Sequence, residues 1–167
     1  MFWRGVWGYL PANVVQGVVG FLAIVLFTRL LSPEEFGRYA LAFSVFTLAH
    51  VAVFTWLEAA MARFWAASKP GADLQGHFAG LYRTALLLTA AFVPLALLAV
   101  WLWPADPLFR IAVAVGLMGC PVRCLVKLAQ ERLRAEGEVS KSAGIDMTVT
   151  AAGLLIGVGF ALGGAGG

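Results

Sequence analysis

Charged side chains are scarce in this sequence. Asp, Glu, Lys and Arg together make up 13% of its 167 residues, against about 25% in a typical soluble domain. Apolar residues make up 61%, and the mean hydropathy is +0.86. So little charge beside so much apolar surface argues against an ordinary soluble domain and predicts a membrane protein with several spans.

The sequence also lacks the residue patterns of most enzymes. It has no Ser/His/Asp set, no metal-ligand cluster and no phosphate-cradling glycine loop. Its two cysteines, Cys120 and Cys124, lie four residues apart in an apolar run, which favours packing over a disulfide or a zinc site. The basic residues flank apolar runs without interleaved aromatic residues, so the high pI does not indicate nucleic-acid binding. We expect no enzyme, cofactor, metal or nucleic-acid partner.

Five apolar runs are each long enough to cross a bilayer as a helix, which takes about 20 residues. They cover residues 6–28, 36–61, 84–103, 108–130 and 145–162. The first run is too long for the apolar part of a signal peptide and ends without an Ala-x-Ala cleavage pattern, so it predicts a retained span. We therefore expect an all-α polytopic helix bundle that forms a single membrane-embedded lobe over residues 1–167.

Lys and Arg are distributed unevenly over the links between these runs. With the amino terminus on the cytoplasmic side, nine of the twelve fall on that side, and only Arg29, Arg38 and Arg110 fall on the other. Cytoplasmic links of membrane proteins carry such an excess of basic residues. The sequence therefore predicts a multi-pass protein of the cytoplasmic (inner) cell membrane, with the amino terminus inside and the carboxyl terminus outside.

Residues 28–40 form the predicted corner between the first two spans and read Thr-Arg-Leu-Leu-Ser-Pro-Glu-Glu-Phe-Gly-Arg-Tyr-Ala. Ser32 can cap the next helix, Pro33 fits its first turn, and Glu35 completes a capping box. Arg29 and Gly37 flank these residues and belong to the same structural turn. The pattern predicts a tight helical hairpin.

Polar and small residues in the first span share one helical face. They are Asn13, Gln16, Gly17 and Gly20. Such a face should meet protein or a water-filled cavity rather than lipid. Two interpretations stay open, helix–helix contact and cavity lining.

The second span carries Thr47, His50, Phe54 and Glu58 on one face. Glu58 lies near the predicted end of the span, so we expect its side chain to extend toward the membrane interface near Arg63. His50 is more central. It is either a buried imidazole satisfied by hydrogen bonds or one that lines a cavity and responds to protons.

A basic stripe is predicted along the second half of the fourth span, just past Pro121. Its members are Arg123, Lys127, Gln130 and Arg134. Two interpretations stay open: the basic side chains extend toward nearby headgroups, or they form one wall of a cavity open to the cytoplasm. Glu131 is placed to pair with Lys127.

Further expectations concern the helix ends. Residues 64–82 predict a turn and an interfacial segment, and Pro94 predicts a kink in the third span. Asp146 is expected in the first turn of the fifth span, near the positive end of the helix dipole. Gly153 and Gly157 permit close helix approach in that span.

The phrase from Thr28 to Tyr39 resembles the first extracytoplasmic turn of polysaccharide and O-antigen flippases, which belong to the multidrug, oligosaccharidyl-lipid and polysaccharide exporter superfamily. In that pattern an Arg-Leu-Leu precedes Pro-Glu-Glu-Phe-Gly-x-Tyr, as at residues 29–39. Residues 59–64 and 133–142 are also similar to the family's layout. The resemblance covers essentially the whole chain.

The resemblance implies two six-helix lobes around a central cavity and alternating access that moves a lipid-linked oligosaccharide to the outer leaflet. With five spans, this chain corresponds to the amino-terminal part of such a transporter. The resemblance thus implies membrane lipids, a lipid-linked saccharide and either a second lobe or a homo-oligomer as partners. Cationic cavity residues would meet the lipid pyrophosphate.

The leading hypothesis is therefore a flippase-type exporter. From the helical faces we select as candidate cavity residues Asn13, Gln16, His50, Arg123 and Lys127. One alternative is a small membrane scaffold that binds partners through its glycine faces. Another is an ion-coupled multidrug exporter of the same superfamily, in which His50 or Glu58 binds the coupling ion.

Overall fold

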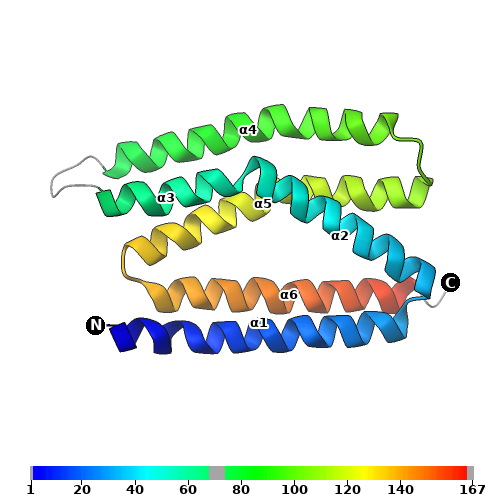
Figure 1. Cartoon of the computed structure of the whole chain (residues 1–167), viewed down its shortest axis with the longest axis horizontal. Coiled ribbons are helices and arrows are strands. Elements are labelled where there is room, and N and C mark those ends of the chain that lie inside the picture. Colours follow the sequence, from blue (N-terminus) through cyan, green and yellow to red (C-terminus); the bar gives the residue numbers. More distant parts are fainter. Residues whose placement is uncertain (1, 68–73, 165–167) are drawn as a thin grey trace. The chain divides into compact units, whose positions relative to one another are not determined.

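The computed structural model describes residues 2–67 and 74–164, and side chains are described for 13–64, 76–159 and 161–163. The regular structure of the described residues is helical (Figure 1). The helices are α1 (Phe2–Leu30), α2 (Pro33–Val53), α3 (Thr55–Ala67), α4 (Leu74–Leu102), α5 (Pro107–Ala135) and α6 (Val139–Gly164). The predicted all-α class is confirmed.

Five of these helices are long and apolar enough to cross a membrane, namely α1, α2, α4, α5 and α6. Large apolar side chains on them are left uncovered by protein. Leu48, Leu87 and Leu155 are each more than 70% exposed, an arrangement that suits contact with lipid chains. The prediction of five spans is confirmed, and their orientation in the membrane stays a prediction.

The predicted second span, residues 36–61, is interrupted in the structure. α2 ends at Val53, Phe54 has turn conformation, and α3 begins at Thr55. Across the interruption, the Phe54 N–H still donates to the His50 carbonyl at 2.9 Å, but the Leu57 N–H donates to the Phe54 carbonyl at 3.0 Å, one residue closer than in an α-helix. The prediction of one continuous helix was wrong at this point.

Other predicted bounds also shift. α4 begins at Leu74, ten residues before the predicted third span, so much of the expected link 64–82 is helix. α4 continues as one helix through Pro94. α6 begins at Val139, six residues before the predicted fifth span. The turn signal at residues 69–71 lies outside the described residues.

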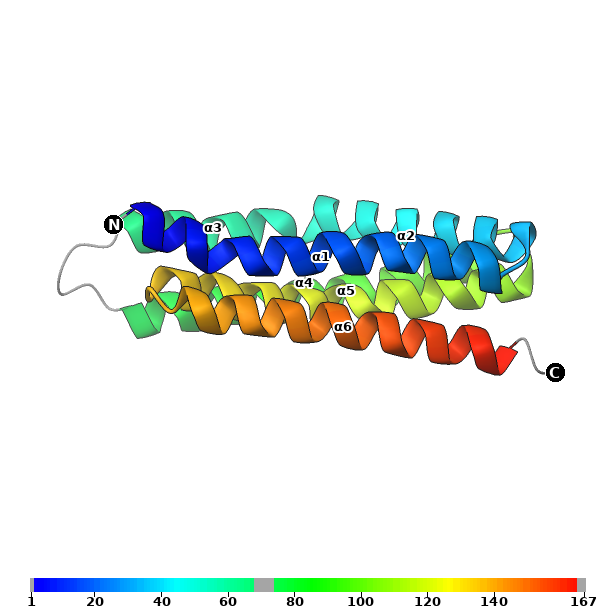
Figure 2. The ribbon, with the colours of Figure 1, turned by 90° about the horizontal axis from the view of Figure 1, so that it is seen from below.

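The chain divides into two compact units, residues 1–37 with 136–167 and residues 38–135. We call them the α1–α6 unit and the central unit. In the α1–α6 unit the two helices lie side by side and run in the same direction (Figures 1 and 2). Gly157 permits this approach, since a Cβ there would lie 2.9 Å from Cζ of the buried Phe27. The predicted close approach at Gly157 is confirmed, whereas Gly153 has nothing within 4 Å of its Cβ position.

In the central unit, α5 packs against both α3 and α4. The buried side of α5 follows the helical period and consists of Val113, Leu117, Cys120, Cys124 and Leu128. From α3, Leu57 and Met61 are fully buried in the same core. Both cysteines are free and buried, so the prediction that they pack in the core is confirmed.

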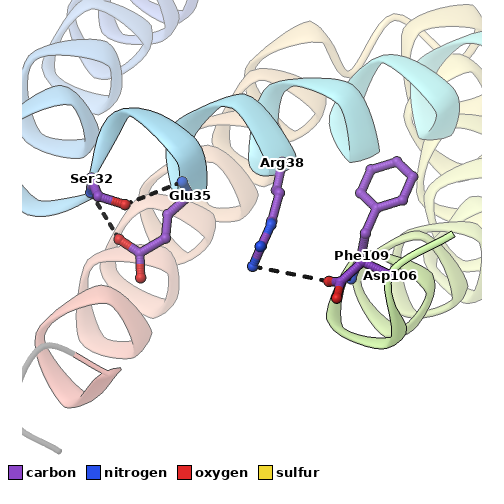
Figure 3. A network of polar contacts seen from close by, with 5 residues as sticks. All are labelled: Ser32, Glu35, Arg38, Asp106 and Phe109. Carbon is purple, nitrogen blue, oxygen red and sulfur yellow. Dashed lines mark hydrogen bonds and ion pairs between the residues drawn. The ribbon is translucent and has the colours of Figure 1, made fainter.

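Local hydrogen bonds close the helix ends (Figure 3). At the start of α2, Ser32 Oγ accepts from the Glu35 N–H at 3.3 Å, and Glu35 Oε2 accepts from the Ser32 N–H at 2.8 Å. These two bonds are the predicted capping box. At the start of α5, Asp106 Oδ2 accepts from the Phe109 N–H at 3.2 Å and lies 4.0 Å from Nη1 of Arg38.

Arg110 holds α4 and α5 together at this end of the central unit. Its Nε donates to the Val100 carbonyl at 3.0 Å, and its Nη2 donates to the Trp101 carbonyl at 2.7 Å. Both carbonyls lie in the last turn of α4, where the regular helical donors are missing, although the Val100 carbonyl also accepts from the Trp103 N–H at 3.3 Å. One side chain of α5 therefore caps the preceding helix.

Candidate functional site

A buried pair of titratable side chains lies in the central unit, where α2 gives way to α3. Nε2 of His50 and Oε1 of Glu58 are 2.9 Å apart. The side chain of His50 is 5% exposed and that of Glu58 is 17% exposed. The expectation that Glu58 extends toward the interface was wrong, because its carboxyl turns inward to His50. The interruption at Phe54 makes this contact possible.

An aromatic ladder surrounds the pair. It follows one face of α2 from Tyr39 and consists of Tyr39, Phe43, Phe46, His50 and Phe54, with neighbouring ring centroids 5.9–6.4 Å apart. Phe54 then meets Phe92 of α4 edge-on at 5.4 Å. Such spacings are those of attractive aromatic pairs. The imidazole of His50 is thus one member of a row of neighbouring rings, stacked on Phe54 and tilted against Phe46.

Helix α5 forms the other side of the site. Cβ positions at Gly116 and Gly119 would lie 3.5 and 3.7 Å from Phe46, so the absence of side chains there brings α2 close to α5. Sγ of Cys120 lies 3.6 Å from the Phe46 carbonyl. The guanidinium carbon of Arg123 lies 5.3 Å from the Phe46 ring centroid, in a cation–π contact.

Two polar atoms of the site are buried without a hydrogen-bond partner among the described residues, Oγ1 of Thr47 and Nδ1 of His50. They lie three residues apart on one face of α2. Buried polar atoms are paired in the great majority of cases, so each such exception calls for an explanation. We expected hydrogen bonds to satisfy a buried His50 imidazole. Nε2 has such a bond, to Glu58, and Nδ1 has none among the described residues.

The predicted basic stripe of α5 does not form a uniform wall. Arg123 is exposed, Lys127 is half-buried, and Gln130 is 1% exposed in the core. Further along, Nη1 of Arg134 lies 2.5 Å from Oε1 of Glu131. The stripe therefore divides into a more exposed half, with Arg123 and Lys127, and an ion-paired half at the end of the helix.

At that same end of α5, the guanidinium carbon of Arg132 lies 4.6 Å from the ring centroid of Phe78 on α4. Cation–π contact of this kind orients a basic side chain along apolar surface while its charge remains near water. Sequence analysis had assigned Phe78 to an interfacial segment and had not paired it with Arg132.

Two of the five candidate cavity residues lie in the other unit. Gln16 of α1 donates a hydrogen bond from Nε2 to Oδ2 of Asp146 on α6. Asp146 is therefore not in the first turn of its helix, as predicted, but about two turns inside it, where it joins two spans. Asn13, Gly17 and Gly20 are exposed, with nothing within 4 Å of either glycine's Cβ position.

Of the candidate cavity residues, the structure brings together His50 and Arg123, through the ring of Phe46. Gln16 pairs instead with Asp146, which sequence reasoning had left at a helix end. The contact between Gln16 and Asp146 joins residues 130 positions apart, and no local pattern indicates it. The aromatic ladder had a detectable signal, since its members recur at i, i+4, i+7, i+11 and i+15 from Tyr39.

Comparison with known proteins adds one finding. A family model described as "polysaccharide biosynthesis protein" matches residues 2–166, essentially the whole chain. No curated protein and no solved structure matches the chain significantly.

Proposed function

Because this chain belongs to the polysaccharide biosynthesis protein family, we propose that it is a membrane transporter of the flippase type. It moves a lipid-linked oligosaccharide or polysaccharide precursor across the cytoplasmic membrane by alternating access between the two sides. The observation that carries the proposal is the family match over residues 2–166. Five helices able to cross a membrane support it.

The charge distribution suits an anionic lipid headgroup. Arg123 and Lys127 lie one turn apart on α5, which is long and apolar enough to cross a membrane. A phosphate group binds arginine through two parallel hydrogen bonds, and the attraction strengthens where water is excluded. We assign these two side chains to the pyrophosphate of the carrier lipid, with His50 in the same unit.

A transport cycle of this kind needs two lobes that face each other across the substrate path. We propose that residues 1–167 supply one lobe, with the amino terminus in the cytoplasm, and that a second lobe or a second copy supplies the other. Nine basic residues on the predicted cytoplasmic side support this orientation.

Deletion of the gene in its host tests the proposal. Surface polysaccharide should fall, and the lipid-linked precursor should accumulate on the cytoplasmic face of the membrane, measured by its accessibility to a membrane-impermeant sugar-oxidising reagent. Expression of the chain should restore both. An unchanged distribution of precursor between the two faces would contradict the proposal.

Substitutions test the role of α5. Arg123→Gln and Lys127→Gln should each slow restoration severalfold, because each removes one charged contact to phosphate. Arg123→Lys should retain part of the activity, since it keeps the charge and loses the forked geometry. Arg83→Gln, which removes an exposed charge from α4, is the matched control and should have no effect at equal expression.

A further inference from the structure

The interruption between α2 and α3 has no local cause in the sequence. No glycine or proline occurs between Gly37 and Pro70, although sharp kinks usually arise at such residues or where a side chain inserts. In a straight helix, residues eight positions apart are separated by about 12 Å along the axis. Nε2 of His50 and Oε1 of Glu58 are 2.9 Å apart. This pair therefore spans the interruption, with one side chain on α2 and the other on α3.

The hydrogen-bonding needs of His50 depend on its protonation. A neutral imidazole has one donor and one acceptor nitrogen, whereas an imidazolium has two donors. With Glu58 ionised, Nε2 is the donor to its carboxylate. Nδ1 of the neutral ring then presents a lone pair, and it is buried with no hydrogen-bond partner among the described residues. The backbone carbonyl of Cys120 on α5 lies within reach of the imidazole, since Sγ of the same cysteine is 3.6 Å from the carbonyl of Phe46, one turn before His50. A lone pair and a carbonyl oxygen repel, whereas an N–H at Nδ1 would be attracted.

Each helix around the pair contributes identifiable groups. α3 supplies the carboxylate of Glu58, and α5 supplies the guanidinium of Arg123 with the thiol and carbonyl of Cys120. Cys124 of α5 lies close enough to Glu58 for the two to interact electrostatically. α4 contributes the apolar ring of Phe92 through Phe54. The pair therefore has one anion and one nearby cation, and one added proton makes the imidazole–carboxylate pair neutral overall.

We propose that His50 and Glu58 form a proton-binding site that clamps the α2–α3 interruption to α5. A proton from the aqueous phase binds Nδ1, and the resulting imidazolium donates from Nε2 to Glu58 and from Nδ1 to the Cys120 carbonyl. Three helices are then joined through one ring. Loss of the proton returns Nδ1 to an acceptor and removes this link between His50 and α5, while the contacts of Phe46 with α5 remain. The site acts on the conformation of the bundle and is independent of which solute the protein carries.

Nitrogen NMR on the full chain in lipid nanodiscs tests proton binding directly. The sequence contains two histidines, His50 and His77, and His77→Gln assigns the signals. As the pH falls, His50 should change from one ring N–H to two. Glu58→Gln should weaken proton binding at His50 about tenfold or more, because it removes the charge that stabilises the imidazolium. Glu138→Gln, which alters a partly exposed carboxylate paired with Lys141, should leave the titration unchanged.

A second measurement on the same chain tests the clamp. Spin labels at the exposed positions Leu41 and Phe64 report the distance across the α2–α3 interruption. The distribution of distances between the two labels should narrow over the pH range in which His50 gains its second ring proton. Glu58→Gln should shift this narrowing and the His50 titration to the same new pH range. The proposal is overturned if His50 keeps one ring N–H from pH 5 to 9, if Glu58→Gln leaves its titration in place, or if the distances do not follow the titration.

Discussion

Replacing Phe54 by alanine tests how the interruption between α2 and α3 is held. Phe54 is fully buried, with its ring 5.9 Å from that of His50 and 5.4 Å from that of Phe92. When membrane helices separate, an apolar side chain moves into lipid, which is as apolar as the protein core. The loss on substitution therefore comes from packing and not from transfer out of water.

The expected loss of unfolding free energy follows from the volume that the Phe54 ring fills. Removing a phenylalanine ring opens a cavity of about 100 Å³, which at ~24 cal/mol per Å³ amounts to about 2.4 kcal/mol. The lost ring contacts with His50 and Phe92 add about 0.5–1.5 kcal/mol. Phe54→Ala should thus lower the free energy of unfolding by about 3–4 kcal/mol. Phe54→Leu, which retains much of the volume, should lower it by less than about 1.5 kcal/mol.

Unfolding in mixed micelles of increasing SDS fraction, followed by circular dichroism, measures these differences. Leu48→Ala is the matched control, since Leu48 is 71% exposed on the same helix and should change the free energy by less than about 0.5 kcal/mol. If Phe54→Ala costs no more than Leu48→Ala, the ring stack does not hold the interruption, and the reasoning is refuted.

Three further substitutions test other parts of the fold by the same unfolding assay. Ser32→Ala should lower stability by about 1 kcal/mol through loss of the capping bond, and an unchanged midpoint would contradict the capping box. Gly157→Val should cost about 1–3 kcal/mol by forcing α1 and α6 apart, whereas Gly153→Val, with open space at its Cβ position, should cost far less. Arg110→Gln should lower the free energy of unfolding by about 1.5–3 kcal/mol, because it leaves two carbonyls at the end of α4 without their charged donor. If Arg83→Gln lowered stability equally, the effect would not be specific to this cap.

Features set by near neighbours in the chain were predictable. The capping box at Ser32 and Glu35 depends on residues three apart, and the structure contains both of its hydrogen bonds. The burial of Cys120 and Cys124 followed from their spacing on one helical face. The family resemblance likewise depended on the continuous phrase from Thr28 to Tyr39, and the family match over residues 2–166 confirms it.

Features set by distant contacts were missed or misplaced. Glu58 was expected near the interface because a continuous helix would carry it there, but the interruption at Phe54 turns it toward His50. Asp146 was expected at a helix end, and a hydrogen bond from Gln16 places it between two spans. Substrate contact by the five candidate cavity residues, Asn13, Gln16, His50, Arg123 and Lys127, stays a prediction.

By itself, the sequence determined how many helices are long and apolar enough to cross a membrane and where the first hairpin turns. Bilayer thickness fixes the length of each span, and helix capping depends only on adjacent residues, so both are local properties. Only the tertiary structure decided where a helix of good local propensity is broken and which polar side chains meet. Those outcomes depend on contacts between residues far apart in the sequence or on different helices, such as Phe54 with Phe92 and Gln16 with Asp146.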